Sequence, residues 1–125
     1  MFQIEFDDYY ELLALHRTIM SAKFCENPLI KEVQGSPYVA KVSFKVFDSL
    51  VNSLLAVGKV HEADKWRQWQ VADMNRDETP LMLEMLNSDA MKSLNIDDRR
   101  SFIENFMAPL LLEQDLLNEL AVQKS

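Results

Sequence analysis

Glycine is nearly absent from this sequence: only Gly35 and Gly58 occur among 125 residues, together with four prolines. Sandwiches and barrels built from many short strands need far more turn residues, so these folds are disfavoured. Apolar residues instead recur every three or four positions, which is the period of an amphipathic helix. No linker or low-complexity run divides the chain. The sequence therefore predicts an all-α fold, a compact single-domain bundle of five to six helices over residues 1–125.

Local signals set the expected helix boundaries. Ser-Pro at 36–37 and Thr-Pro at 79–80 each supply a capping hydroxyl followed by a proline, which suits the first helical position. The first helix carries an apolar stripe, and Lys23 lies away from that stripe. The expected helices cover about residues 8–26, 37–57, 60–74, 79–86, 95–108 and 110–122, and the stripe of the first one consists of Leu12, Leu15, Ile19 and Ala22.

Two segments have a second interpretation. Residues 2–6 alternate apolar and polar side chains, which predicts either a short β-strand or an extended arm that packs its aromatic side chains on the first helix. Residues 38–47 also alternate. Polar residues there and just beyond are nevertheless spaced by three and four, at Lys41, Lys45, Asp48 and Asn52, which favours a mostly buried helix.

Charge and motif content exclude several classes of protein. Thirteen basic and twenty acidic residues give a net charge of −7, the wrong sign for a protein that neutralises nucleic-acid phosphates. The longest uncharged stretch, residues 49–58, is far too short to span a membrane. The early acids do not resemble a secretory signal, so we expect a cytoplasmic protein. No glycine-rich loop is present to hold a phosphate, and we expect no cofactor.

The most specific local pattern is a twelve-residue run between two expected helices. Asp73, Asn75, Asp77 and Glu84 occupy positions 1, 3, 5 and 12, and their oxygen atoms are the ligands that Ca²⁺ prefers. The run resembles a calcium-binding EF-hand loop, although Glu78 occupies position 6, where the sharp turn of such loops requires glycine. A metal- or ligand-responsive regulator that uses this loop is therefore an alternative function.

Enzymatic chemistry has few candidate residues. His16, His61 and Cys25 are the only imidazoles and the only thiol, and a single cysteine rules out an internal disulfide or a multi-cysteine metal site. None of the three has a local partner set that would activate it. An enzyme with a site dispersed around these residues is a second alternative, and we expect a protein that is not an enzyme.

Acidic residues concentrate at the two ends of the chain. Residues 1–30 hold five acids and two bases, whereas residues 31–60 hold two acids and four bases. If the two ends meet, they form one acidic face, which would attract a basic protein partner. We therefore expect a non-catalytic protein-binding module, such as an inhibitor, immunity protein or antitoxin. The expected partner-binding residues are Asp7, Asp8, Glu11, Glu113, Asp115 and Glu119.

Six leucines crowd the last expected helix, residues 110–122. A helix that is apolar over more than half its girth either docks in the centre of a bundle or buries its second stripe against another molecule. This leucine-rich helix thus offers one route to a homodimer.

Overall fold

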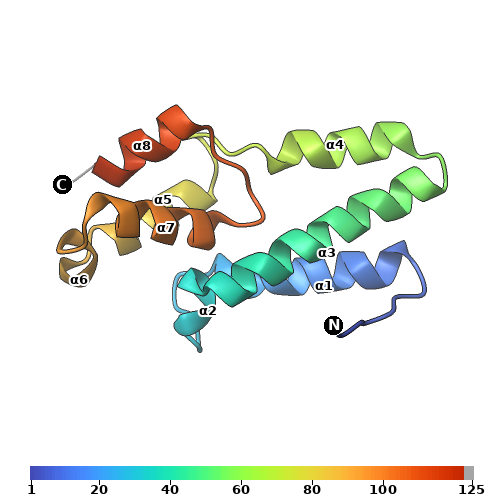
Figure 1. Cartoon of the computed structure of the whole chain (residues 1–125), viewed down its shortest axis with the longest axis horizontal. Helices are drawn as coiled ribbons and strands as arrows, with labels where there is room; N and C mark the ends of the chain where they lie inside the picture. Colours follow the sequence, from blue (N-terminus) through green and yellow to red (C-terminus); the bar gives the residue numbers. More distant parts are fainter. Residues whose placement is uncertain (123–125) are drawn as a thin grey trace.

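The computed structural model describes residues 1–122 of the chain, and helices dominate this part (Figure 1). Its only β-type pairing within those residues is an isolated parallel bridge between Val71 and Leu111. The prediction of an all-α fold is confirmed, although the number of helices exceeds the five to six expected. The structure has eight helices in this range: α1 (Tyr9–Lys23), α2 (Glu32–Gly35), α3 (Pro37–Ala56), α4 (Val60–Gln70), α5 (Glu78–Leu86), α6 (Asp89–Lys92), α7 (Ile96–Met107) and α8 (Gln114–Val122).

Several helix starts follow the capping signals in the sequence, and one does not. The Thr79 signal is wrong: α5 begins at Glu78, and the Thr79 hydroxyl donates to the Asp73 carbonyl at 2.9 Å. The Asp8 carboxylate accepts a hydrogen bond from the Glu11 N–H at 3.1 Å, and the Ser36 hydroxyl accepts from the N–H groups of Tyr38 and Val39 at 3.2 Å. Each of these bonds satisfies a donor that the first turn of a helix leaves unpaired. Residues 38–47 are therefore helical, as the polar stripe predicted. Shortly after α3, Gly58 adopts a φ of 78°, which side-chain-bearing residues rarely reach.

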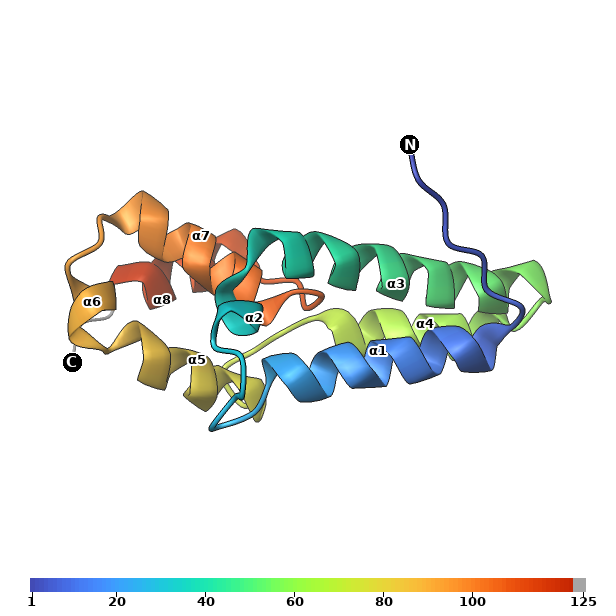
Figure 2. The ribbon, with the colours of Figure 1, turned by 90° about the horizontal axis from the view of Figure 1, so that it is seen from below.

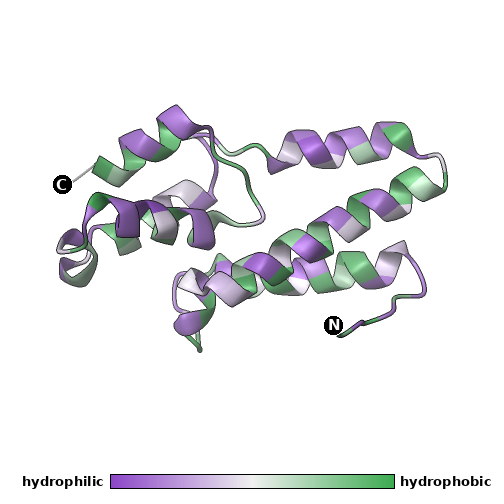
Figure 3. Ribbon diagram, viewed as in Figure 1, coloured by the Kyte–Doolittle hydropathy of each residue, from purple (hydrophilic) through white to green (hydrophobic). Residues whose placement is uncertain are grey.

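The helices form two groups along a long axis (Figures 1 and 2). Helices α1, α3 and α4 lie side by side in one group, helices α5 to α8 form the other, and the short α2 lies between them. Helix α4 is hydrophilic over most of its length (Figure 3), and it buries only Ala63 and Gln70. No helix among residues 1–122 is both long and apolar enough to cross a bilayer.

Each group of helices has its own hydrophobic cluster. One contains Phe47 and Leu50 of α3 and Leu12 of α1, and the other is built around Phe106 of α7 with residues from α5 and α8. Trp69, near the end of α4, packs against both clusters. The Trp69 indole therefore contributes to both halves of the core.

The N-terminal residues form an extended arm and no strand. Phe2 and Ile4 are almost completely exposed, so they do not pack on the first helix as one interpretation expected. Phe6 is more sheltered, because it lies beside α1 and the end of α3. The arm points away from the helices (Figure 2).

The first helix is rotated from its expected orientation. Its buried residues are Leu12, His16 and Lys23, so the lysine expected on the polar side lies in the interior. Ala22, expected on the buried stripe, is exposed. The carbonyl of Asn105 in α7 holds the Lys23 side chain in place, and this tertiary contact turns part of the apolar stripe outward.

The expected helix over residues 110–122 is wrong in its first turn. Helix α8 begins only at Gln114, because the main chain of Leu111 pairs with residues at the end of α4. The Leu111 N–H donates to the Gln70 carbonyl at 2.8 Å, and the Leu111 carbonyl accepts from the Ala72 N–H at 2.9 Å. Leu110, Leu117 and Leu120 are buried in the chain's own core. Leu112 and Leu116 are half-buried against the same core, and Leu111 and Val122 are exposed. The homodimer route based on this helix stays a prediction.

Candidate functional site

Buried polar side chains are candidates for a functional site, and Arg99 is the largest of them. Its Nε donates to the carbonyl of Ala121 at 2.7 Å, and its Nη1 donates to the carbonyl of Met91 at 2.9 Å and to that of Leu86 at 3.3 Å. These oxygens lie in the last turns of α8, α6 and α5, where a helix leaves carbonyl groups unpaired. Arg99 thus holds three helix ends together, and it is fully buried.

Lys23 and Gln34 also donate hydrogen bonds to main-chain carbonyl groups, and they join the end of α1 to its neighbours. The Lys23 Nζ donates to the carbonyl of Asn105 in α7 at 2.7 Å, and burial lowers the pKa of Lys23 to about 8. The Gln34 side-chain amide donates to the carbonyls of Lys23 and Cys25 at 2.9 and 2.8 Å. These contacts fasten α1 to α2 and α7, so these groups serve the fold.

The three candidate catalytic residues occupy different environments. His16 is buried among aromatic rings, with ring centroids at 5.4 Å from Trp66 and 5.3 Å from Trp69. Burial lowers the pKa of His16, and the charge of Arg17 shifts it in the same direction. His61 is exposed near the start of α4, whereas Cys25 follows the end of α1 at the other end of that helix group. No common site joins the three side chains.

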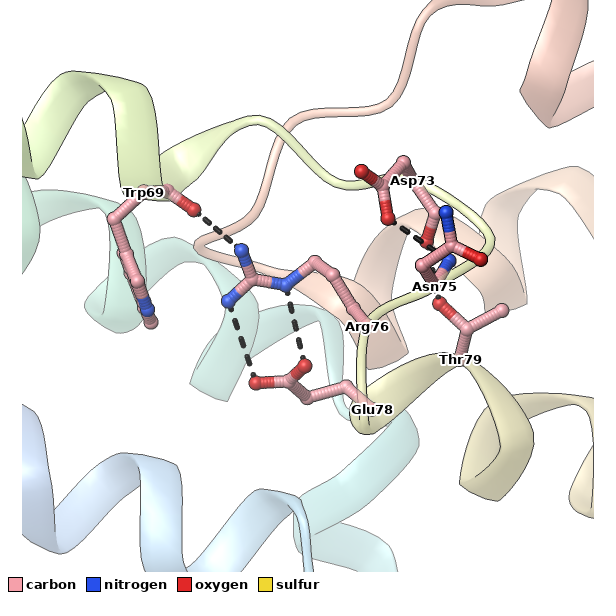
Figure 4. Close-up of polar contacts among 6 residues, drawn as sticks. All are labelled: Trp69, Asp73, Asn75, Arg76, Glu78 and Thr79. Carbon is pink, nitrogen blue, oxygen red and sulfur yellow. Dashed lines mark hydrogen bonds and ion pairs between the residues drawn. The ribbon is translucent and has the colours of Figure 1, made fainter.

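The loop that resembles a calcium site is organised around Arg76 (Figure 4). The Arg76 guanidinium donates to the Trp69 carbonyl at 2.6 Å, pairs with the Glu78 carboxylate at 3.2 Å and lies 4.9 Å from the centroid of the Trp69 ring. The Asp73 carboxylate accepts a hydrogen bond from the Asn75 N–H at 2.9 Å.

Helix α5 begins at Glu78, so Glu84 lies on a helix and outside the loop. Asp73, Asp77 and Glu84 do not converge, since no group of three or more His, Cys, Asp or Glu side chains among residues 1–122 is arranged to hold a metal ion.

Three of the six expected partner-binding acids come together at the start of α1. Asp8 caps the helix, and the Glu11 carboxylate accepts a hydrogen bond from the Asp7 N–H. Beside them lies a hollow of about 600 Å³, which we call the N-terminal cleft. Its lining residues come from the arm, from α1, from the end of α3, from the turn after it and from the start of α4: Phe6, Asp7, Asp8, Tyr9, Tyr10, Leu12, Ser53, Leu54, Ala56, Val57, Lys59 and Glu62.

The other three acids are elsewhere. Glu113 precedes α8, and Asp115 and Glu119 lie on it; all three side chains are exposed. Helix α8 and the start of α1 are at opposite ends of the molecule in both views (Figures 1 and 2). The single acidic face that would form if the chain ends met is therefore absent, because the two helix groups extend along one axis and separate the ends.

A second surface was not expected from the sequence. Two adjoining hollows of about 420 and 330 Å³ run between α1, α2 and α3 and share Thr18, Ala22 and Val33. We call them together the α1–α3 groove. Its other lining residues are Ile19, Ser21, Cys25, Asn27, Pro28, Leu29, Ile30, Tyr38, Val39 and Val42.

The sequence contains one indication of this groove, namely the apolar residues that line it. Ile19 and Ala22 belong to the apolar stripe of the first helix, and Val42 lies on the helix expected to be mostly buried. The sequence does not reveal that Lys23 and His16 take the buried side of α1 and so leave this apolar surface open.

Comparison with known proteins adds no relative: no protein-family model, no curated protein and no solved structure matches this chain.

Proposed function

We propose that this chain is a non-catalytic protein-binding module that binds a basic segment of a partner protein in the N-terminal cleft. The observation that carries the proposal is the gathering of Asp7, Asp8 and Glu62 around one hollow with aromatic walls. Lys59 is the only base among the described residues that line it. The cleft therefore has a negative lining, and it belongs to a chain whose net charge is already −7.

The lining matches the chemistry of a lysine or arginine side chain. Such side chains have an apolar stem and a charged head. The stem can pack on Leu54 and Val57, while the head meets the carboxylates. Tyr10 is 72% exposed, and the face of an exposed aromatic ring attracts a cation. We therefore expect the bound segment to contain lysine or arginine beside small apolar residues.

The acids on and before α8 have a different part in the proposal. Glu113, Asp115 and Glu119 lie far from the cleft, so they do not contact a segment bound there. They add to the negative potential of the whole molecule, which accelerates encounter with a basic protein. An inhibitor of a basic enzyme, in the manner of an immunity protein or an antitoxin, is one form that such a module takes.

The placement of the polar interior favours binding over catalysis. Arg99, Lys23 and Gln34 are already bonded to main-chain carbonyls, and His16 is enclosed by aromatic rings. Catalytic acids and bases need to reach a reacting group in a pocket. The carboxylates of Asp7, Asp8 and Glu62 in the N-terminal cleft, in contrast, are exposed to solvent, where another molecule can reach them.

The test measures binding of a labelled eight-residue peptide of alternating arginine and alanine by fluorescence anisotropy. The double variant Asp7→Asn/Asp8→Asn removes two charges and keeps a capping side chain at residue 8, because asparagine caps as well as aspartate. We expect Kd to rise about tenfold at low salt, which corresponds to about 1.4 kcal/mol.

The matched control is Asp115→Asn/Glu119→Gln, which changes the net charge by the same amount at the other end of the molecule. Its Kd should stay within about twofold, and wild-type binding should weaken as salt rises. Equal losses in the two double variants, or binding that does not respond to salt, would contradict the proposal.

A further inference from the structure

A second hollow adjoins the N-terminal cleft. It has a volume of about 380 Å³ and is lined by Tyr9, Glu62, Lys65, Trp66 and Trp69. We call it the tryptophan hollow. Tyr9 and Glu62 line the N-terminal cleft as well, so the two hollows meet at these residues. A segment bound in the cleft can therefore place one side chain in the tryptophan hollow.

Aromatic rings in fixed positions form the walls of this hollow. Glu62, Lys65, Trp66 and Trp69 are three or four residues apart along α4, so they share one face of that helix. Tyr9 comes from the start of α1, and its hydroxyl oxygen accepts a hydrogen bond from the Trp66 Nε1–H at 3.3 Å. The rings of Trp66 and Trp69 meet at 79° with their centroids 5.7 Å apart. Because the rings hold one another, an entering side chain meets a preformed wall.

Two arginines of the chain itself already lie over rings of this aromatic cluster. The Arg76 guanidinium is 4.9 Å from the centroid of the Trp69 ring, and the Arg67 guanidinium is 5.5 Å from that of Phe47. Each guanidinium also pairs with one carboxylate, that of Glu78 for the first and that of Asp48 for the second. A ring face attracts a cation, and a carboxylate balances its charge. The cluster therefore uses the same pair of groups twice to hold a guanidinium.

Trp66 has both of these groups beside it but no guanidinium. Its ring packs against those of Phe47 and Trp69 and is only half-buried. Within residues 1–122, no lysine or arginine lies over it. Glu62 lies one turn earlier on α4, lines the same hollow and takes part in no ion pair in this part of the chain. A ring and a carboxylate are therefore available together for a cation from another molecule.

The charge of the two hollows together is negative. Lys65 opposes Glu62 within the tryptophan hollow, although the two side chains form no ion pair with each other. The cleft adds Asp7 and Asp8 against Lys59, so the acids outnumber the bases. A cation is therefore favoured over an anion, and Lys65 is the one charge in the tryptophan hollow that works against it.

We infer that the tryptophan hollow binds an arginine side chain of the partner's basic segment, with its guanidinium on the ring of Trp66 and paired with Glu62. This rests on the function proposed for the N-terminal cleft, and it narrows the ligand from any basic segment to one that contains arginine. A guanidinium is planar, so it stacks on an indole and donates two hydrogen bonds to one carboxylate. The ammonium group of lysine is compact and strongly hydrated, so it fits this hollow less well.

The first experiment compares two labelled peptides by fluorescence anisotropy: the arginine–alanine peptide and the same peptide with lysine in place of arginine. Their charges are equal, so the carboxylates of the cleft alone do not distinguish them. The wild type should bind the arginine peptide about fivefold more tightly, which corresponds to about 1 kcal/mol. Trp66→Leu should lose this preference, whereas Trp66→Phe, which keeps a ring, should retain part of it. Equal affinities of the wild type for the two peptides would overturn the assignment.

Two exposed residues provide variants that leave the aromatic cluster intact. Glu62→Gln should weaken binding of the arginine peptide about fivefold. Asp64→Asn is the matched control, since it removes the same charge from an exposed position on α4 that lines neither hollow, and it should change Kd by less than about twofold. Lys65→Gln should strengthen binding about twofold, because it removes the opposing charge. Equal losses in Glu62→Gln and Asp64→Asn, or weaker binding by Lys65→Gln, would contradict the arginine site.

A smaller probe separates the hollow from the cleft. N-acetyl-arginine amide should shift the indole N–H resonance of Trp66 in NMR spectra, a signal assigned by its loss in Trp66→Phe, and N-acetyl-lysine amide should shift it much less. Asp7→Asn/Asp8→Asn should show a similar shift, because these acids line only the cleft. An unchanged Trp66 resonance would refute the arginine site even where both peptides bind. A shifted resonance, together with peptide binding that is insensitive to Asp7→Asn/Asp8→Asn, would refute the cleft alone.

Discussion

The guanidinium of Arg99 in α7 donates to the carbonyl of Ala121 in α8 across 2.7 Å, although 22 residues separate them in sequence. The same side chain bonds the ends of α5 and α6. A charged group with no exposed surface therefore organises one end of the molecule.

Replacing this guanidinium should lower the stability of the fold. Arg99→Met keeps an unbranched apolar stem and removes the donors, which leaves buried carbonyls without partners. Hydrogen bonds to charged groups contribute roughly 1.5–3 kcal/mol each, so we expect the free energy of unfolding to fall by about 3 kcal/mol or more. Urea denaturation measures the loss. The exposed control Arg17→Met should change stability by less than about 0.5 kcal/mol, and a similar loss in both variants would refute the role of Arg99.

Because Lys23 is buried, we expect the free energy of unfolding to rise at alkaline pH. Burial lowers the pKa of Lys23 from 10.5 to about 8. Between these values the unfolded chain keeps a proton that the folded chain has released, so the free energy of unfolding rises with pH in this window. A shift of this size corresponds to about 3 kcal/mol.

The measurement compares the wild type with Lys23→Met from pH 7 to 10.5, because other groups titrate equally in both proteins. The difference should stay constant below about pH 8 and then move in favour of the wild type as pH rises. If the difference in the free energy of unfolding between the two proteins stays constant over the whole range, folding does not lower the pKa of Lys23 and the prediction is wrong.

Because His16 is buried, we expect the folded chain to lose stability in weak acid. Burial among the rings of Phe47, Trp66 and Trp69 lowers the pKa of His16 below 6.5. The unfolded chain therefore takes up a proton first as pH falls through 6.5, and the folded state loses stability relative to it. His16→Phe keeps a ring in the cluster and removes this effect. Thermal melts at pH 7.5 and 5.5 should show a larger decrease in Tm for the wild type than for the variant; equal decreases would refute the prediction.

We expect the loop between α4 and α5 not to bind calcium. Arg76 places a positive charge inside the run of acids, and α5 begins before Glu84 can reach back to Asp73. Calorimetric titration with millimolar CaCl₂ should therefore give no binding heat, and the melting temperature should stay unchanged. Binding heat that disappears in Asp73→Asn would restore the regulatory alternative.

The sequence predicted features that depend on neighbouring residues. Helix starts at Asp8, Ser36 and Asn95 use the side-chain caps that the sequence offers, because a cap and its N–H group are two or three residues apart. The clustering of Asp7, Asp8 and Glu11 followed for the same reason.

Features that depend on distant residues were not predictable in this way. Lys23 can be buried because a carbonyl 82 residues away accepts a hydrogen bond from its Nζ. A lysine in a helical pattern otherwise indicates a solvated face. Leu111 leaves the expected last helix because its main chain pairs with the end of α4. The packing of helices that are distant in sequence also brings Glu62 into the N-terminal cleft and leaves α8 far from it.

Trp69 has a consequence for how this protein can be dissected. Because its indole packs against both hydrophobic clusters, a fragment that ends after α4 keeps the ring but loses the ring's contacts with the second cluster. A fragment that starts at α5 lacks the ring altogether. Chimaeras that exchange one helix group for foreign helices must therefore supply a tryptophan-sized side chain at this junction.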